Sequence, residues 1–459
     1  MTVKTEHLKK VYFLGIGGIG MSALARYLHA AGARVHGYDK TPTTLTRELE
    51  AEGMHIHYDD RPDMIPVDAD LIIYTPAVPR ELNEYITAQN SGIPMAKRSE
   101  FLGAVTNSRN TLAVAGTHGK TTVSTMLAHI LYESPAGCTA FLGGISKNHN
   151  TNLLLKPDSS FMVAEADEFD RSFLRLHPAG AVITSVDADH LDIYQTHEAL
   201  LESFSAFAGG IRENGFLVCK KGLPLTPATS TGVKTYTYAL RGDADFCTES
   251  LKLENGQYTF NLIVPGGRIE GFRPGLPGLF NVENAVAAAS VAWLAGVEPD
   301  DIQRGIATFS GVKRRFDHRV VKEGLLYIDD YAHHPEELRA CIDSVKALYP
   351  GRHITGIFQP HLYSRTRDFA DGFAESLSLL DRVILLDIYP ARELPIPGVS
   401  SAMLLEKITV PDRQVAQRDE VIEMMENMDA DVILTLGAGD IDQLVEPLTI
   451  ALNNKNKRP

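Results

Sequence analysis

Cysteine is scarce in this chain of 459 residues, and tryptophan occurs only once. The four cysteines are scattered and show none of the close spacings typical of a metal site; they are Cys138, Cys219, Cys247 and Cys341. This usage argues against a disulfide framework and indicates a reducing compartment. We therefore expect a cytoplasmic protein.

Long apolar runs and long basic runs are also absent. No segment approaches the roughly 18 uninterrupted apolar residues of a membrane span, and residues 1–10 are polar and charged, unlike a signal peptide. The net charge is −14, without an extended cluster of lysine or arginine. The sequence thus predicts no membrane insertion and no nucleic-acid partner.

The length predicts about three domains at ~150 residues each. Predicted strands and helices alternate along the chain, so we expect an α/β fold with three domains. Residues 1–106 would form a Rossmann-like domain, residues 107–312 a central domain of the P-loop ATPase type with a mixed sheet, and residues 313–459 a second Rossmann-like domain. Residues 232–272, rich in threonine, tyrosine and glycine, are expected to form antiparallel strands.

A glycine-rich loop follows the first predicted strand, and residues 15–22 read Gly-Ile-Gly-Gly-Ile-Gly-Met-Ser. Glycines at these positions let backbone amides approach a diphosphate at a helix N-terminus. Asp39 lies 19 residues after Gly20, where its carboxylate would accept from a ribose hydroxyl. Both NAD and a UDP-sugar fit this loop, and a simple tight turn is the alternative.

A second loop, residues 116–122, reads Gly-Thr-His-Gly-Lys-Thr-Thr. Lys120 would bridge a transferred phosphate, and Thr121 would place its hydroxyl on Mg²⁺. The full Walker spacing needs a glycine where this chain has Val114, which argues against an ordinary P-loop kinase or GTPase. A helix-opening turn without a ligand is the alternative.

The two loops differ in one decisive residue, because the first contains no lysine. The first loop therefore suits a passive diphosphate, whereas the second suits a phosphate that is transferred. A protein with both would couple ATP cleavage to a reaction on a nucleotide-linked substrate.

Acidic side chains follow the next two predicted strands. Glu165 and Glu168 end one of them, and Asp189 and His190 follow the other. Carboxylate oxygens suit Mg²⁺, and one imidazole is tolerated. We expect a Mg²⁺ site here, although a lone histidine is often merely packed or solvated.

Three further segments concentrate polar groups. Asn281 and Asn284 open a predicted helix, where they would cap it or contact adenine. The segments 329–335 and 358–365 follow apolar strands and carry several histidine and arginine residues. Loops in such positions frequently carry function.

Taken together, these motifs resemble the Mur ligases of peptidoglycan synthesis, over nearly the whole chain. The motifs stand in the order of that family: GIGGIGMS, GTHGKTT, EADE, DHLD, NVENA, DDYAHHP, FQPH and GAGDI. The resemblance implies a UDP-binding domain, an ATPase domain and a domain that docks an amino acid. It implies ATP, Mg²⁺, UDP-N-acetylmuramate and L-alanine as ligands, an acyl-phosphate intermediate, and a monomer or weak homodimer.

The resemblance also implies site residues by position. The UDP substrate would contact Gly17, Gly18, Ile19, Gly20, Met21, Ser22, Asp39 and Thr75. ATP would contact Gly116, Thr117, His118, Gly119, Lys120, Thr121, Thr122, Asn281, Asn284, Arg315 and Asp329. The Mg²⁺ ligands would be Thr121, Glu165 and His190. The catalytic residues would be Lys120, His333, His361 and Arg365, with either histidine able to deprotonate the amine.

Several positions depart from the family pattern. Leu362 stands where alanine-adding members usually have arginine, Ser185 replaces a frequent asparagine, and Phe169 and Arg171 replace small residues. No lysine occurs between Lys156 and Lys220, where ligases that add later residues carry a carbamylated lysine. This absence favours an alanine-adding member.

Three alternatives remain at this point. An NAD(P)-dependent oxidoreductase would use the first loop but leaves the second unexplained. A regulatory protein without catalysis would not need Lys120, Glu165 and His190. Within the family, a ligase that joins whole peptides to UDP-N-acetylmuramate is the runner-up.

Overall fold

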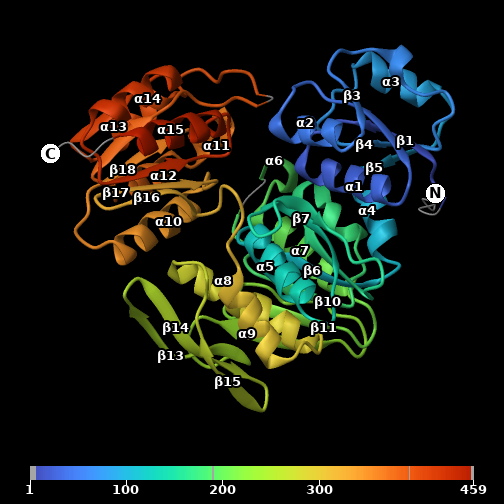
Figure 1. Ribbon diagram of the computed structural model, residues 1–459, viewed down its shortest axis with the longest axis horizontal. Coiled ribbons are helices and arrows are strands. Elements are labelled where there is room, and N and C mark those ends of the chain that lie inside the picture. Colours follow the sequence, from blue (N-terminus) through green and yellow to red (C-terminus); the bar gives the residue numbers. More distant parts are fainter. Residues whose placement is uncertain (1–6, 189–190, 392, 456–459) are drawn as a thin grey trace. The chain divides into compact units, whose positions relative to one another are not determined.

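The computed structural model describes residues 7–188, 191–391 and 393–455. Its strands form three sheets of five, ten and six strands (Figure 1). The chain divides into two compact units, and each is described by itself. The larger unit comprises residues 1–252, 259–275 and 282–310; the smaller comprises residues 253–258, 276–281 and 311–459.

The first sheet is entirely parallel, with strand order β3-β2-β1-β4-β5. Its strands are β1 (Lys10–Leu14), β2 (Arg34–Tyr38), β3 (His55–His57), β4 (Leu71–Tyr74) and β5 (Met95–Lys97). The connecting helices are α1 (Ile19–Ala30), α2 (Thr44–Ala51), η1 (Pro62–Met64), α3 (Asn83–Asn90) and α4 (Arg98–Thr106). This order matches the expected Rossmann-like arrangement, in which ligands bind at the carboxyl ends of the strands.

The second sheet has the order β15-β14-β13-β12-β11-β10-β6-β9-β7-β8. Its strands are β6 (Asn110–Ala115), β7 (Thr139–Ser146), β8 (Thr151–Leu154), β9 (Phe161–Ala166), β10 (Gly180–Ile183), β11 (Phe216–Lys220), β12 (Lys234–Ala239), β13 (Phe246–Glu254), β14 (Gln257–Val264) and β15 (Gly267–Phe272). Strand β6 runs parallel to both of its neighbours, β9 and β10.

The expectation of antiparallel strands over residues 232–272 is only partly correct. Strands β14 and β15 form an antiparallel pair, but β12 pairs in parallel with β11 and with β13. Residue composition distinguishes strand from helix but does not specify the partner strand, which is why the sequence did not show this pairing.

Helices cover this second sheet. They are α5 (Lys120–Glu133), η2 (Phe169–Arg175), α6 (Leu191–Tyr194), α7 (His197–Gly209), α8 (Leu279–Leu294) and α9 (Pro299–Thr308). The first two sheets also share apolar packing, because α1 lies against β7 and β8 (Figure 1). Phe141 and Leu153 belong to the same buried cluster as Val11 and Leu24. The first two modules therefore fold as one compact unit.

The third sheet has the order β16-β17-β21-β18-β19-β20. Its strands are β16 (Asp317–Lys322), β17 (Leu325–Asp330), β18 (Ile354–Phe358), β19 (Arg382–Leu385), β20 (Asp412–Val415) and β21 (Val432–Leu436). Only β16 is antiparallel to its neighbour. The helices are α10 (Pro335–Leu348), α11 (Tyr363–Asp368), α12 (Ala370–Leu377), α13 (Ser401–Lys407), α14 (Arg418–Asn427) and α15 (Asp442–Asn454).

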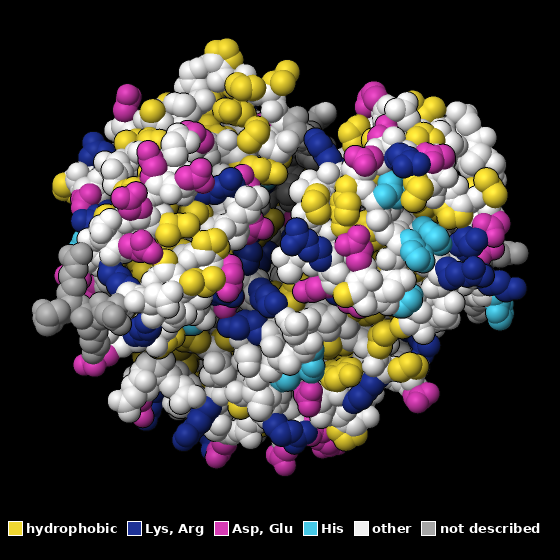
Figure 2. Space-filling view, turned by 45° about the horizontal axis from the view of Figure 1, so that its top comes forward, with side chains coloured by type: hydrophobic (Ala, Val, Ile, Leu, Met, Phe, Trp, Pro, Cys, Tyr) yellow, Lys and Arg dark blue, Asp and Glu magenta, His cyan; other side chains and the backbone are white. Residues whose placement is uncertain are grey.

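The three α/β modules, with a mixed central sheet, confirm the expected fold class. The exact domain boundaries near residues 106 and 312 stay a prediction. None of the described helices combines the length and apolarity that a membrane span requires. On the face shown in Figure 2, lysine and arginine side chains form small groups interspersed with aspartate and glutamate.

Candidate active site

The second loop lies at the carboxyl end of the central strand β6. In the parallel pairing of β6 with β9, Val114 lies opposite Glu165, so the acidic end of β9 emerges beside the loop. Gly116 has φ +139°, and a Cβ there would collide with the Thr184 hydroxyl at the end of β10. The loop therefore depends on glycine at this position.

Lys120, the first residue of α5, is tightly held in this structure. Its Nζ donates to the Gly116 carbonyl at 2.6 Å and to both carboxylate oxygens of Glu168, at 2.7 and 2.9 Å. The Glu168 side chain is fully buried. The lysine is thus positioned by a short ion pair at the loop that the sequence assigns to ATP.

Burial and the neighbouring charges shift the pKa values of both Lys120 and Glu168. Burial lowers the pKa of Lys120, but the carboxylates of Glu168, Asp167 and Glu165 outweigh burial and raise the pKa overall. Burial raises the pKa of Glu168, against the opposing effect of Lys120. Lys120 therefore stays cationic, as a residue that neutralises phosphate charge must.

Ser185, one of the departures from the family pattern, holds the loop backbone in place. Its hydroxyl accepts from the His118 amide at 2.7 Å and lies 3.0 Å from the Thr117 hydroxyl. Thr117 in turn accepts from the amide of Asp187 at 3.0 Å. The Ser185 hydroxyl therefore contributes to fixing the segment from Thr117 to His118.

Two of the three expected Mg²⁺ ligands lie near this loop. Thr121 is buried in the first turn of α5. Glu165 lies against Gly143, where any Cβ would collide with the Glu165 carboxylate. Oxygen donors from α5 and β9 fit a hard cation such as Mg²⁺. The third expected ligand, His190, lies outside the described residues.

The two asparagines expected near adenine have different surroundings. Helix α8 begins at Leu279, so Asn281 does not cap it; its amide nitrogen donates instead to the Pro277 carbonyl at 2.7 Å. The Asn284 side chain reaches the second loop, because a Cβ at Gly119 would lie 3.1 Å from Asn284 Oδ1. Asn284 thus lies beside the second loop, whereas its expected contact with adenine stays a prediction.

Asp39, which the sequence analysis identified as a candidate ligand, is hydrogen-bonded to the backbone of the first loop. The Gly17 amide donates to Asp39 Oδ2 at 2.8 Å, and a Cβ at Gly17 would lie only 2.9 Å from that oxygen. Gly18 precedes the first turn of α1 with no side-chain cap, and Ile19 is exposed. The N-terminus of α1 is thus left open to an anion.

Met21 and Ser22 face the interior rather than the loop opening. Both are buried in α1, and the Ser22 hydroxyl donates to the Ile19 carbonyl at 3.0 Å. The Asn152 amide donates to that hydroxyl at 2.8 Å. Thr75 lies beside the loop, where its methyl group would collide with a side chain at Gly15. The expected substrate contacts of Met21, Ser22 and Thr75 stay predictions. In this structure, the hydrogen bond between Ser22 and Asn152 holds α1 against β8.

Arg98 is a residue of this region that the sequence did not reveal. A Cβ at Gly20 would lie 2.7 Å from its Nη1, and its Nη2 lies 3.4 Å from Asp167 Oδ2. Arg98 thus connects the first loop with the acidic end of β9. No sequence motif marks it, whereas Glu168 was marked by its position directly after an apolar strand.

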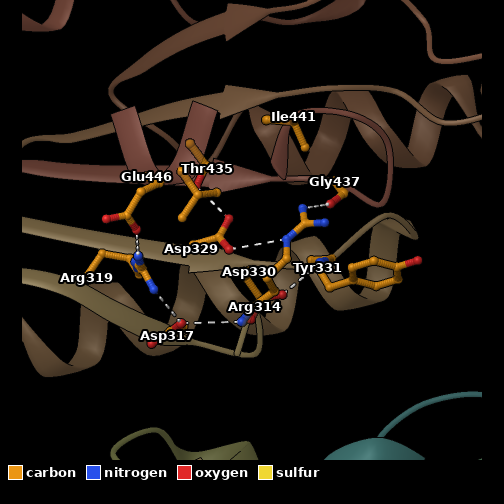
Figure 3. Close-up of polar contacts among 12 residues, drawn as sticks. Arg314, Asp317, Arg319, Asp329, Asp330, Tyr331, Thr435, Gly437, Ile441 and Glu446 are labelled. Atoms are coloured by element: carbon orange, nitrogen blue, oxygen red, sulfur yellow. Dashed lines mark hydrogen bonds and ion pairs between the residues drawn. The ribbon is translucent and has the colours of Figure 1, made fainter. Parts of the chain in front are cut away.

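In the smaller unit, buried polar residues cluster at the ends of β17 and β21 (Figure 3). Asp329 accepts from the Thr435 hydroxyl at 2.7 Å and pairs with Arg314 at 3.3 Å. Arg314 also donates to the Gly437 carbonyl at 2.7 Å. Burial raises the pKa of Asp329, while Arg314 opposes the shift. Asp329 therefore organises the strand ends.

The neighbouring Asp330 fixes two loop backbones. It accepts from the Phe316 amide at 2.6 Å and from the Ala332 amide at 2.7 Å, and burial raises its pKa to about 6. The Arg315 guanidinium, expected to contact ATP, lies over the Tyr331 ring at 4.7 Å. The structure thus places Arg315 beside the segment 329–335.

The two histidines proposed as bases lie near each other, with ring centroids 6.1 Å apart. His333 Nδ1 lies 3.0 Å from the Tyr331 carbonyl. A carbonyl only accepts, so Nδ1 carries the proton in that contact, and in the neutral ring Nε2 is the nitrogen with the lone pair. The His361 ring stacks on Tyr389.

Arg365, the expected carboxylate ligand, lies in the short helix α11 and is largely buried. Leu362, which replaces the expected arginine, precedes α11 with φ +68°. Its amide donates to the Tyr389 carbonyl at 2.9 Å. Arg171, in the larger unit, also differs from the family pattern. Its φ is positive, and its guanidinium lies over the Tyr194 ring at 5.4 Å from the ring centroid. Nothing in the structure explains Phe169.

Three family models match the chain in succession. Residues 10–110 match the Mur ligase family catalytic domain, residues 114–292 the Mur ligase middle domain, and residues 314–439 the Mur ligase glutamate ligase domain.

Curated relatives match over almost the full length. A UDP-N-acetylmuramate–L-alanine ligase of Parabacteroides distasonis is 53% identical over 98% of both chains. The enzyme of the same name from Porphyromonas gingivalis strain W83 is 50% identical over 96% of this chain and 98% of its own.

Solved structures agree with these matches. The crystal structure of UDP-N-acetylmuramate-alanine ligase from Thermotoga maritima is similar with a TM-score of 0.84, at 26% identity over 98% of this chain and all of its own. A murein peptide ligase of Psychrobacter arcticus shares the fold, with a TM-score of 0.72 at 24% identity over 98% of this chain and all of its own.

Proposed function

The chain belongs to the Mur ligase family, and from this premise we propose that it joins L-alanine to UDP-N-acetylmuramate at the expense of ATP. The family that the sequence motifs predicted is thereby confirmed. The observation that carries the proposal is the 53% identity to a UDP-N-acetylmuramate–L-alanine ligase over 98% of both chains.

The reaction proceeds in two steps. A carboxylate oxygen of UDP-N-acetylmuramate attacks the γ-phosphorus of ATP, and the bond to the β-phosphate oxygen breaks to give an acyl phosphate and ADP. The amine of L-alanine then attacks the acyl carbon, and phosphate leaves. Both partners of the first step are anions, so positive charge must reduce their repulsion.

Lys120 supplies part of this charge from a fixed position. The Gly116 carbonyl and the Glu168 carboxylate orient its ammonium group, so that little reorganisation is needed when the phosphate arrives. Thr121 and Glu165 would hold Mg²⁺. The ion would further neutralise the phosphate charge.

The first loop is proposed to hold the uridine diphosphate. The open N-terminus of α1 and the closed backbone around Gly17 support this role. An NAD(P)-dependent oxidoreductase would use only this loop, and family membership across all three modules disfavours it. The presence of Lys120, Glu165 and His190 in the sequence likewise disfavours a regulatory protein that has lost catalysis.

For the second step, we infer that His333 accepts the proton of the amine. In the neutral ring Nε2 carries the lone pair, because Nδ1 donates to the Tyr331 carbonyl. Arg365 is proposed to bind the alanine carboxylate as a bidentate pair. The cytoplasmic location and the oligomeric state stay predictions from the sequence.

Oxygen labelling tests the proposed reaction. UDP-N-acetylmuramate labelled with ¹⁸O in its carboxylate is incubated with ATP, Mg²⁺ and L-alanine, and the released phosphate is examined by mass spectrometry. The proposal requires one labelled oxygen in the phosphate. Turnover that yields unlabelled phosphate would show that no acyl phosphate forms.

A further inference from the structure

We propose that His129, Glu133 and His149 form a binding site for a divalent transition-metal ion of the zinc type, separate from the Mg²⁺ site. His129 and Glu133 lie one turn apart on α5, and His149 lies in the turn between β7 and β8. All three belong to the larger unit. Among the described residues, this is the one group of at least three His, Cys, Asp or Glu side chains whose potential ligand atoms all lie within 4.8 Å of one another.

The spacing of the two imidazoles suits a shared ion. His129 Nδ1 lies 3.2 Å from His149 Nε2. Two nitrogens bound at ~2.0–2.1 Å to a tetrahedral zinc ion lie about 3.3 Å apart, which is close to this separation. The imidazoles therefore need little movement to bind one ion together.

A third ligand is within reach. Glu133 Oε1 lies 3.9 Å from His149 Nε2, and one potential ligand atom from each residue lies within 4.8 Å of the others. The Glu133 side chain is 47% exposed, so it is free to adjust its rotamer. Two imidazoles and one carboxylate leave a fourth position for water, as in known zinc sites with three protein ligands.

The hydrogen bonds behind His129 fix its tautomer. The Thr308 hydroxyl donates to the Arg304 carbonyl at 2.9 Å, so its oxygen accepts from His129 Nε2, also at 2.9 Å. Nε2 therefore carries the proton, and Nδ1 presents its lone pair toward His149. Metal-ligating histidines are typically oriented by such a bond from the nitrogen that does not bind the ion.

The turn that carries His149 is also held in place. The Asn148 amide donates to the Thr308 carbonyl at 2.8 Å, and Asn148 Oδ1 accepts from the Ser310 amide at 2.8 Å. The edge of the Tyr132 ring packs against His149, with centroids 5.1 Å apart. The segment after α9 thus anchors both sides of the proposed site.

Burial keeps the imidazoles in the form that binds metal. It lowers the pKa of His129 to about 4, and it also lowers the pKa of His149. Both rings are therefore neutral near pH 7, so binding does not require the loss of a proton from an imidazolium.

The ligand set distinguishes this site from the ATP loop. Imidazole nitrogens favour zinc and its neighbours over Mg²⁺, which prefers oxygen. His129 lies nine residues after Lys120, which is about 13 Å along α5. An ion here would connect the distal half of α5 to the turn between β7 and β8 and would stabilise the folded chain.

Metal binding to the whole protein tests the proposal. Chelator-treated protein is titrated with Zn²⁺ by calorimetry in excess Mg²⁺, and with Co²⁺ by visible absorption. We expect one Zn²⁺ ion per chain, the intense absorption of tetrahedral Co²⁺, and a rise in Tm with Zn²⁺. A wild-type protein that binds no Zn²⁺ would overturn the proposal.

His149→Asn should weaken Zn²⁺ binding at least ~10-fold and abolish both the Co²⁺ absorption and the rise in Tm. His55→Asn is the control, because His55 is exposed and stacks on His36 in another histidine pair; it should leave binding unchanged. If His149→Asn does not fold, Glu133→Gln gives the same test from an exposed position. Retention of the ion by either ligand variant, or its loss in His55→Asn, would overturn the assignment.

Discussion

Lys120 Nζ lies 2.7 Å from Glu168 Oε2, so the lysine of the ATP loop is paired with a fully buried carboxylate at the end of β9. The pair fixes the ammonium group where the transferred phosphate is proposed to bind. It also means that the two residues must be changed together to separate catalysis from folding.

Lys120→Ala should lower turnover ~10²- to 10³-fold, because it removes a positioned charge from the transferring phosphate. The single variant also leaves Glu168 buried without its lysine, which should destabilise the protein. The double variant Lys120→Ala/Glu168→Gln should recover stability in thermal unfolding without recovering turnover. Near-normal turnover in either variant would refute the role of the loop.

Gly17→Val should raise the KM for the UDP-sugar and leave the KM for ATP nearly unchanged. A side chain at position 17 would lie within 3 Å of both Asp39 Oδ2 and Thr46 Cγ2 (2.9 and 2.7 Å), and the first loop would deform. Steady-state kinetics with each substrate varied in turn measures both constants. An effect confined to ATP would reverse the assignment of the two loops.

Arg365→Ala should raise the KM for L-alanine by ~10- to 100-fold, the usual effect of losing a charged hydrogen bond. The KM for the UDP-sugar should change little. Arg367→Ala is the matched control, since Arg367 lies on the same short helix but is exposed and pairs with Asp368. An unchanged dependence on alanine in Arg365→Ala would place the carboxylate elsewhere.

Activity should be insensitive to bicarbonate. No lysine occurs between Lys156 and Lys220, so no lysine there can form a carbamate near the metal site. Assays after removal of CO₂, with and without added bicarbonate, should give equal rates. Reactivation by bicarbonate would reveal a carbamylated lysine elsewhere in the chain.

Asp330 should make stability depend on pH in one direction. Burial raises its pKa to about 6 in the folded state, above the ordinary value of ~3.9. The folded state then binds more protons, so the unfolding free energy should fall as pH rises from about 4 to about 6. Denaturant unfolding across this range measures the slope.

Asp330→Asn should flatten that slope and lower stability above pH 6, because an amide offers one acceptor where the carboxylate accepts from two amides. Asp343→Asn, at an exposed position on α10, should leave the slope unchanged. An unaltered slope in Asp330→Asn would assign the titration to another group.

The sequence correctly predicted secondary structure where an apolar strand is followed directly by a glycine-rich or polar motif. The segments 329–335 and 358–365 follow apolar strands as predicted, and both glycine loops lead into helices. These features depend on local patterns of apolar residues, glycines and polar side chains.

Other features depend on tertiary contacts and could not be read from the sequence. Arg98 reaches Gly20 and Asp167 from a helix far along the chain, and Asn152 reaches Ser22 from β8. The parallel pairing of β12 with β13 likewise depends on neighbours in the sheet. A linear pattern gives no distance between such residues, so the structure was needed to find them.

The choice of amine tests the central claim most directly. ADP release is measured with UDP-N-acetylmuramate and ATP, in the presence of either L-alanine or a tripeptide of the type that a peptide-joining ligase uses. We predict rapid release with L-alanine and background release with the tripeptide. Release that depends on the tripeptide and not on L-alanine would contradict the proposed function.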